Sequence, residues 1–112
     1  DVLEDERLVD QARARGEQLL AGARALAGEF PEVVREVRGL GLLVGVELTH
    51  EGYGGWIIPE MLKAGVTAAW TLNQQRVIRL EPPLVVSESE IERALQALRG
   101  GVATAFAKLG PL

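Results

Sequence analysis

Residues 76–84 read Arg-Val-Ile-Arg-Leu-Glu-Pro-Pro-Leu, and the rest of the chain can be arranged around this stretch. Its apolar residues and the prolines that follow them predict a short strand that ends near residue 81. Arg79 lies inside this strand, between Ile78 and Leu80. A guanidinium among apolar neighbours loses hydration energy unless an anion meets it. We therefore expect Arg79 to face an anion, either a carboxylate of the protein or part of a ligand.

Three segments have the apolar spacing of amphipathic helices. Residues 1–29 carry apolar residues at intervals of three and four, and so does the segment that follows residues 87–90. Residues 87–90 read Ser-Glu-Ser-Glu, which predicts a capping box at the start of the C-terminal helix. The glycine pair 100–101 predicts a weak point within that helix. Residues 56–64 predict a short helix that ends at Gly65. Because a proline fits only the first turn, Pro59 predicts that the regular helix starts near Ile58, with Trp56 just ahead of it.

The remaining segments predict strands. Residues 66–72 and 76–81 are joined by only three residues, 73–75, which requires an antiparallel hairpin. Residues 39–48 are almost continuously apolar and predict one strand that is buried on both faces. Together with the helices, these strands predict an α+β fold: a small, mostly antiparallel sheet of about three to four strands, covered by helices on one side.

Composition limits the class of function. The chain has 112 residues, enough for one domain, and a net charge of -4 with no basic cluster, which argues against a nucleic-acid or anionic-membrane partner. It has no cysteine, so neither disulfides nor cysteine-rich zinc sites are expected. No apolar run approaches the ~20 residues that a membrane span needs. The default expectation is a cytoplasmic protein.

Few residues suit acid–base or metal chemistry. A catalytic triad would have to use His50, the single histidine, which lies in a glycine-rich connection where an exposed loop residue is the simpler interpretation. No carboxylates stand at ligand-like spacing from it, so no metal site is expected. The only lysines are Lys63 and Lys108, and neither has the apolar setting that lowers a lysine pKa for imine chemistry. Both are interpreted as surface residues.

Three stretches in this chain resemble the C-terminal small domain of class III aminotransferases, enzymes that use pyridoxal phosphate. They are Val-Arg-Gly-Leu-Gly-Leu-Leu-Val-Gly-Val-Glu-Leu (37–48), Lys-Ala-Gly-Val (63–66) and Val-Ile-Arg-Leu-Glu-Pro-Pro-Leu (77–84). With the flanking helices they cover nearly the whole chain. Within the family, residues 68–73 and 77–84 look most like putrescine (diamine) aminotransferases, and acetylornithine and ornithine aminotransferases are the nearest alternatives.

The resemblance implies transfer of an amino group from an ω-amine, such as a diamine or an ornithine derivative, to 2-oxoglutarate. It implies that Arg79 binds the carboxylate of the 2-oxo acid, or pairs with a glutamate of the family's large domain. The lysine that binds pyridoxal phosphate and the phosphate-binding residues belong to that large domain. Residues 1–112 would then be a small-domain fragment of a homodimeric enzyme, and this chain alone is not expected to catalyse transamination.

Simpler interpretations stand beside these roles. Arg79 could form a structural ion pair with Glu81 or Glu47, and a role in substrate binding is favoured only because of the resemblance. For Arg38, a structural hydrogen bond or ion pair is favoured over a substrate contact. Trp56 and Trp70 could line a channel, although half-buried packing is favoured. A stand-alone interaction domain that keeps the fold without catalysis is the alternative function.

Overall fold

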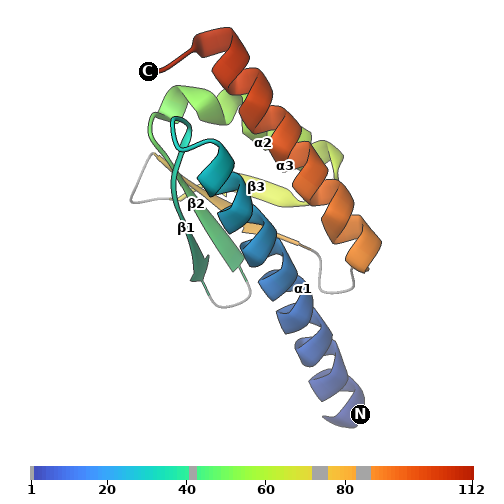
Figure 1. Cartoon of the computed structure of the whole chain (residues 1–112). Coiled ribbons are helices and arrows are strands. Elements are labelled where there is room, and N and C mark those ends of the chain that lie inside the picture. The colour runs from blue at the N-terminus through green and yellow to red at the C-terminus, as the bar shows by residue number, and fades with distance from the viewer. Residues whose placement is uncertain (1, 41–42, 72–75, 83–86) are drawn as a thin grey trace.

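A computed structural model describes residues 2–40, 43–71, 76–82 and 87–112, and within them the chain forms one antiparallel sheet and a layer of helices (Figure 1). The strands lie in the order β1-β2-β4-β3. Along the chain the elements are α1 (Val2–Glu29), β1 (Val34–Leu40), β2 (Leu43–Leu48), the 3₁₀ turn η1 (Glu51–Tyr53), α2 (Gly54–Lys63), β3 (Thr67–Trp70), β4 (Val77–Glu81) and α3 (Glu88–Leu109). The predicted α+β class is confirmed.

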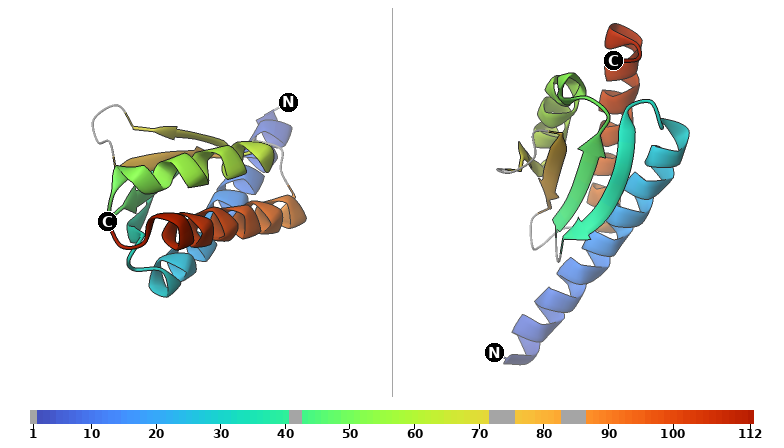
Figure 2. Two further views of the ribbon diagram at one scale, coloured as in Figure 1. Left: turned by 90° about the horizontal axis from the view of Figure 1, so that it is seen from above. Right: turned by 90° about the vertical axis from the view of Figure 1, so that its left-hand side faces the viewer.

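The three helices lie on one side of the sheet, and the described residues leave the other side open (Figure 2). The first turns of α1 extend past the sheet, so that the molecule is elongated, with extents of 50 × 29 × 22 Å (Figure 1). The side of the sheet that faces the helices is called the covered face here, and the other side the open face. This asymmetry decides where a ligand could reach the sheet.

The hydrophobic core lies between the covered face and the helices. Strand residues alternate between the two faces, so every second residue of β2 and β4 points at the helices. Ile78 pairs with Val46, and Leu80 pairs with Val44, and all four are almost completely buried. Burying side chains of this size contributes about 1.5–3 kcal/mol each. From the helices, the largest fully buried core residues are Leu19, Tyr53, Ile57, Met61, Ile91 and Leu98.

The capping box predicted at the start of α3 is confirmed. The Ser87 hydroxyl accepts a hydrogen bond from the Glu90 backbone N–H at 3.2 Å, and the Glu90 carboxylate accepts one from the Ser87 N–H at 3.1 Å. Hydrogen bonds with Ser87 lower the pKa of Glu90 below its usual value; the bond with the Ser87 backbone N–H has the larger effect and the bond with its hydroxyl the smaller one. At the other end, the helix stops at Gly110, which has a φ of 65°. Glycine adopts a positive φ more easily than other residues and is therefore common at this position.

The prediction of one strand over residues 39–48 was wrong. β1 runs to Leu40 and β2 begins at Leu43, and the two strands are antiparallel neighbours in which these residues pair. Residues 41–42 between them lie outside the described residues. An apolar run cannot by itself distinguish one buried strand from two paired ones, and the helices cover one face only. On the open face, Leu43 and Glu47 are therefore only half-buried.

The prediction for the start of α2 was also wrong. The helix begins at Gly54, so that Pro59 lies in its interior and Trp56 lies within it rather than ahead of it. Proline has no N–H, so it leaves the carbonyl of Gly55 without its usual helical partner. Gly55 is exposed, and water can therefore solvate that carbonyl. This exposure explains why the helix tolerates the proline.

The hairpin of β3 and β4 is confirmed by their antiparallel pairing, although its connection, residues 73–75, lies outside the described residues. The helix α3 continues unbroken through Gly100 and Gly101, so the predicted weak point does not interrupt it. A Cβ on Gly101 would lie 3.0 Å from the Trp56 carbonyl oxygen and 3.1 Å from the Ile57 Cα. Gly101 therefore lets α3 pack closely against α2.

Candidate functional site

Arg79 lies on the open face of the sheet and is exposed. Its neighbours across the strands are Gly45 of β2 and Ala69 of β3, which are too small to cover a guanidinium. Ile78 and Leu80, which precede and follow it, point to the covered face instead. The expectation of a guanidinium among apolar side chains was therefore wrong, because strand alternation separates Arg79 from its apolar neighbours. Arg79 remains solvated and accessible.

A cluster of three charged residues lies beside Arg79 on the open face. Glu47 of β2 is 19 % exposed and accepts a hydrogen bond from Arg38 Nη2 at 2.5 Å through its Oε1. Its second oxygen, Oε2, lies 3.4 Å from Arg35 Nε. The structural ion pair expected for Arg38 is confirmed.

Arg35 is a residue that the sequence reasoning did not identify. The pairing of β1 with β2 shifts register between Val34 and Glu36, which marks a bulge or similar irregularity at Arg35. A bulge places two residues of one strand against one residue of its partner, so it can direct Arg35 toward Glu47. The sequence signal was weak, since an irregularity of this kind breaks the alternation on which strand prediction depends.

The described residues contain no ion pair or side-chain hydrogen bond for Arg79. Glu47 pairs with Val77 of β4, so it lies on the diagonal from Arg79, within reach of a long side chain. Glu81 lies two residues farther along β4, and it is exposed. The structural ion pair of Arg79 with Glu47 or Glu81 is not formed here. Arg79 is thus a cation on the open face without a protein anion among these residues.

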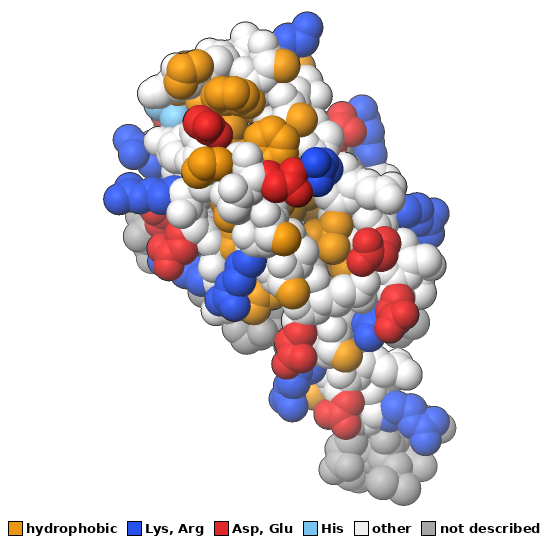
Figure 3. Space-filling view, viewed as in Figure 1, with side chains coloured by type: hydrophobic (Ala, Val, Ile, Leu, Met, Phe, Trp, Pro, Cys, Tyr) orange, Lys and Arg blue, Asp and Glu red, His pale blue; other side chains and the backbone are white. Residues whose placement is uncertain are grey.

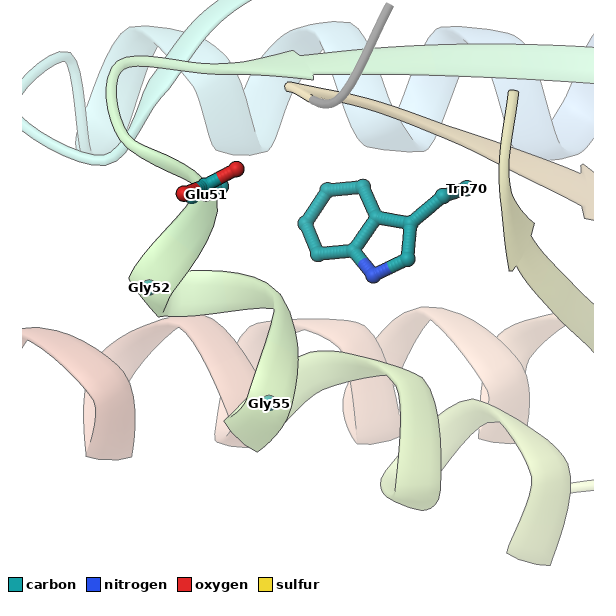
Figure 4. A pocket seen from close by; sticks show the side chains of 4 residues that line it. All are labelled: Glu51, Gly52, Gly55 and Trp70. Atoms are coloured by element: carbon teal, nitrogen blue, oxygen red, sulfur yellow. The ribbon is translucent and has the colours of Figure 1, made fainter. Parts of the chain in front are cut away.

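A hollow of about 590 Å³ lies at the junction of β3, η1 and α2, and its lining residues are Glu51, Gly52, Gly55 and Trp70 (Figure 4). Trp70 is half-buried, as predicted, and its ring lies against Gly54, where an added Cβ would come within 2.2 Å of two ring atoms. Trp56 is 39 % exposed. Trp70 pairs with Ile78, so the hollow and Arg79 lie on opposite faces of the sheet.

The remaining candidates are structural. His50 is half-buried, and its Nδ1 accepts a hydrogen bond from the Gly52 N–H at 2.9 Å, which caps η1. Lys63 and Lys108 are exposed, in agreement with the surface interpretation, and Lys63 lies 3.3 Å from the Glu60 carboxylate. Among the residues that the structure describes, no group of three or more His, Cys, Asp or Glu could hold a metal ion.

The helical side of the molecule has hollows of its own, one of about 220 Å³ between α1 and α3 and one of about 420 Å³ along α1. In the view of Figure 3, acidic and basic side chains are interspersed, and apolar side chains gather toward the upper end, over α2 and the end of α3. None of the described helices combines the length and apolar character needed to cross a membrane. The sheet, by contrast, gathers the charged residues Arg79, Arg38, Arg35 and Glu47 on its open face, which we take as the candidate binding surface.

Residues 1–101 match the family model described as aminotransferase class-III. The chain belongs to the class III aminotransferase family, so the resemblance of its sequence to that family is confirmed. Lysine aminotransferase from M. tuberculosis is a similar solved structure, with 31 % sequence identity and a TM-score of 0.76 over 93 % of this chain and 23 % of that one.

Two further solved structures are similar. Ornithine aminotransferase from Plasmodium yoelii is 26 % identical, with a TM-score of 0.70 over 93 % of this chain and 27 % of that one. Acetylornithine aminotransferase from Elizabethkingia anophelis is 24 % identical, with a TM-score of 0.74 over the same shares of the two chains, and at that identity the likeness shows the fold alone. The chain spans about a quarter of the length of these solved relatives.

Proposed function

We propose that residues 1–112 are the small domain of a pyridoxal-phosphate-dependent aminotransferase, and that Arg79 binds the carboxylate of its 2-oxo acid substrate. The observation that supports this role is an exposed arginine on the open face, without a protein anion among the described residues. A planar guanidinium can bind a carboxylate through two parallel hydrogen bonds, which fixes both its position and its orientation. Family membership supports the reaction class.

The described residues do not fit pyridoxal phosphate by themselves. The Lys63 side chain is 74 % exposed and lies beside Glu60, and Lys108 is exposed, so neither lies in an enclosed pocket where a cofactor could be held. In this proposal, the cofactor and its chemistry are assigned to the family's large domain. The contribution of this chain is to hold the arginine that orients the acid.

The proposed amino donor is an ω-amine, either a putrescine-like diamine or an ornithine derivative, and the acceptor is 2-oxoglutarate. The open face would meet the large domain, because a sheet face that carries partly buried Leu43 and Glu47 resembles a surface that another domain can cover. The complete protein is proposed to be a cytoplasmic homodimer.

The test is to replace Arg79 with alanine in the full-length enzyme and to measure both half-reactions in single turnovers. Loss of a charge-assisted hydrogen bond costs about 1.5–3 kcal/mol, so the half-reaction with the 2-oxo acid should slow about 10- to 100-fold. The half-reaction with a diamine should change far less. Arg76→Ala is the matched control, since Arg76 is also exposed and lies just before β4. Equal loss in both half-reactions would refute the role of Arg79.

A further inference from the structure

Two carboxylates near Arg79 on the open face could pair with it: Glu47 of β2 and Glu81 of β4. The structure shows why Glu47 does not. Glu47 is diagonal to Arg79 across the β2–β4 pair, a separation of about 7–8 Å between backbones that a long side chain can bridge. Only Gly45 stands directly opposite Arg79 on β2, so no side chain of that strand separates the two groups. Without another partner, Glu47 would be the natural anion for Arg79.

The Glu47 carboxylate instead forms ion pairs with two arginines of β1. Arg38 Nη2 contacts Oε1 at 2.5 Å and Arg35 Nε lies 3.4 Å from Oε2, so each carboxylate oxygen already faces a guanidinium. The Glu47 side chain is 19 % exposed, compared with 36 % for Arg38 and 66 % for Arg35. A half-buried carboxylate is held more firmly by its partners than an exposed one, because water screens the pairs less.

We infer that Arg35 and Arg38 are positioning residues: they saturate the Glu47 carboxylate, so that the Arg79 guanidinium stays free for an incoming carboxylate. This inference rests on the proposed role of Arg79. Arg35 and Arg38 act only through Glu47: they prevent it from competing with the substrate. Removing both should release Glu47 to pair with Arg79 and weaken binding of the 2-oxo acid. Glu81 does not replace Glu47 in this role, because it is exposed and has no such link to β1.

The first experiment follows the side-chain Nε–H signal of Arg79 by NMR in the full-length enzyme with isotope-labelled arginine. In the double variant Arg35→Gln/Arg38→Gln, we expect the Arg79 signal to shift and its exchange with water to slow. Adding Glu47→Gln should return both to the wild-type values, whereas adding Glu81→Gln, the matched control, should not. An Arg79 signal that is unchanged in the double variant would overturn the inference. The conservative pair Arg35→Lys/Arg38→Lys, which keeps both charges, should leave the signal near its wild-type position and guards against a general folding defect.

The second experiment measures KM and kcat in the full-length enzyme. An exposed ion pair between Glu47 and Arg79 would raise the KM for the 2-oxo acid about two- to fivefold in the double variant, with kcat unchanged. Adding Glu47→Gln to the double variant should return the KM to the wild-type value. A shifted NMR signal without a change in KM would refute the effect on substrate binding. If instead Arg79→Ala slows both half-reactions equally while the NMR result holds, the proposed function fails and the Glu47 arrangement stands.

Discussion

The two faces of the sheet are made from the same strands but have different surroundings. On the covered face, Val46, Ile78 and Leu80 are buried beneath three helices. On the open face, the residues between them include exposed Arg79 and half-buried Glu47. Neighbouring residues of β4 therefore lie in opposite environments, one without water and the other in it. Strand alternation produces this separation over residues 78–80, whereas Val77, on the same face as Arg79, is buried.

The difference teaches that stability and the proposed binding function are carried by separate sets of residues. Burial of apolar area supplies most of the free energy of folding, and it is concentrated on the covered face. Charged groups on the open face contribute little to stability, because exposed ion pairs are worth about 0–1 kcal/mol. Substitutions on the two faces should thus have separable effects, and the three predictions below test this separation.

The largest effect is expected for Ile78→Ala compared with its neighbour Arg79→Ala. Ile78 is 0 % exposed, so truncation leaves a cavity and should lower the free energy of unfolding by about 2–5 kcal/mol. Arg79→Ala should change it by less than about 0.5 kcal/mol, as for other surface substitutions. Urea denaturation of both variants measures the contrast. Similar losses for the two would break the comparison, and would mean that Arg79 has a structural role on the open face.

An intermediate effect is expected at the contact of α2 with α3, where two consecutive glycines are matched controls for each other. In Gly101→Ala the new Cβ would lie 3.0–3.1 Å from backbone atoms of α2, which cannot move aside easily, so we expect a loss of about 1–3 kcal/mol. In Gly100→Ala the Cβ meets nothing within 4 Å, and the helix should gain about 0.5–1 kcal/mol. Opposite shifts in Tm are the expected result. A gain in both variants would show that the two helices are loosely packed.

The smallest effect is expected at the exposed cap of α3. The Ser87 N–H and hydroxyl lower the pKa of Glu90, so its carboxylate stabilises the folded state above the unfolded pKa of about 4.3. That contribution should disappear as the pH falls through the lower folded pKa. We expect Tm to be higher in the wild type than in Glu90→Gln near pH 6, and the two to converge near pH 3. Glu51→Gln, an exposed site in η1 near the opposite end of α3, corrects for net charge. A difference that persists at low pH would contradict this assignment.

Much of the fold could be predicted from local patterns. The helix over residues 2–29, the capping box at Ser87 and the β3–β4 hairpin follow from apolar spacing, side-chain caps and a short connection. The division of residues 39–48 into two strands could not be predicted, because an apolar run has the same appearance in both cases. Interior Pro59 was misplaced for a related reason: its tolerance depends on the exposure of Gly55, which is a tertiary property.

The candidate site was predicted in part. Arg79 and the ion pair of Arg38 were identified from their positions in the sequence, and the structure confirms the ion pair of Arg38. The solvated position of Arg79 was missed, since its apolar sequence neighbours suggested burial. The contact of Arg35 with Glu47 was missed as well, because it depends on the register shift between β1 and β2 at Arg35.

The sequence by itself determined the class of this protein: periodic apolar residues, caps and family motifs predict an α+β domain of the class III aminotransferase family, and the family match confirms it. These signals are local, because each depends on residues within a few positions of one another. Only the tertiary structure decided which face of the sheet the helices cover, and which guanidinium Glu47 contacts. The contacts of Glu47 depend on the register between the neighbouring strands β1 and β2, including its shift at Arg35. The pairing of β2 with β4, which are far apart in the chain, places Gly45 opposite Arg79.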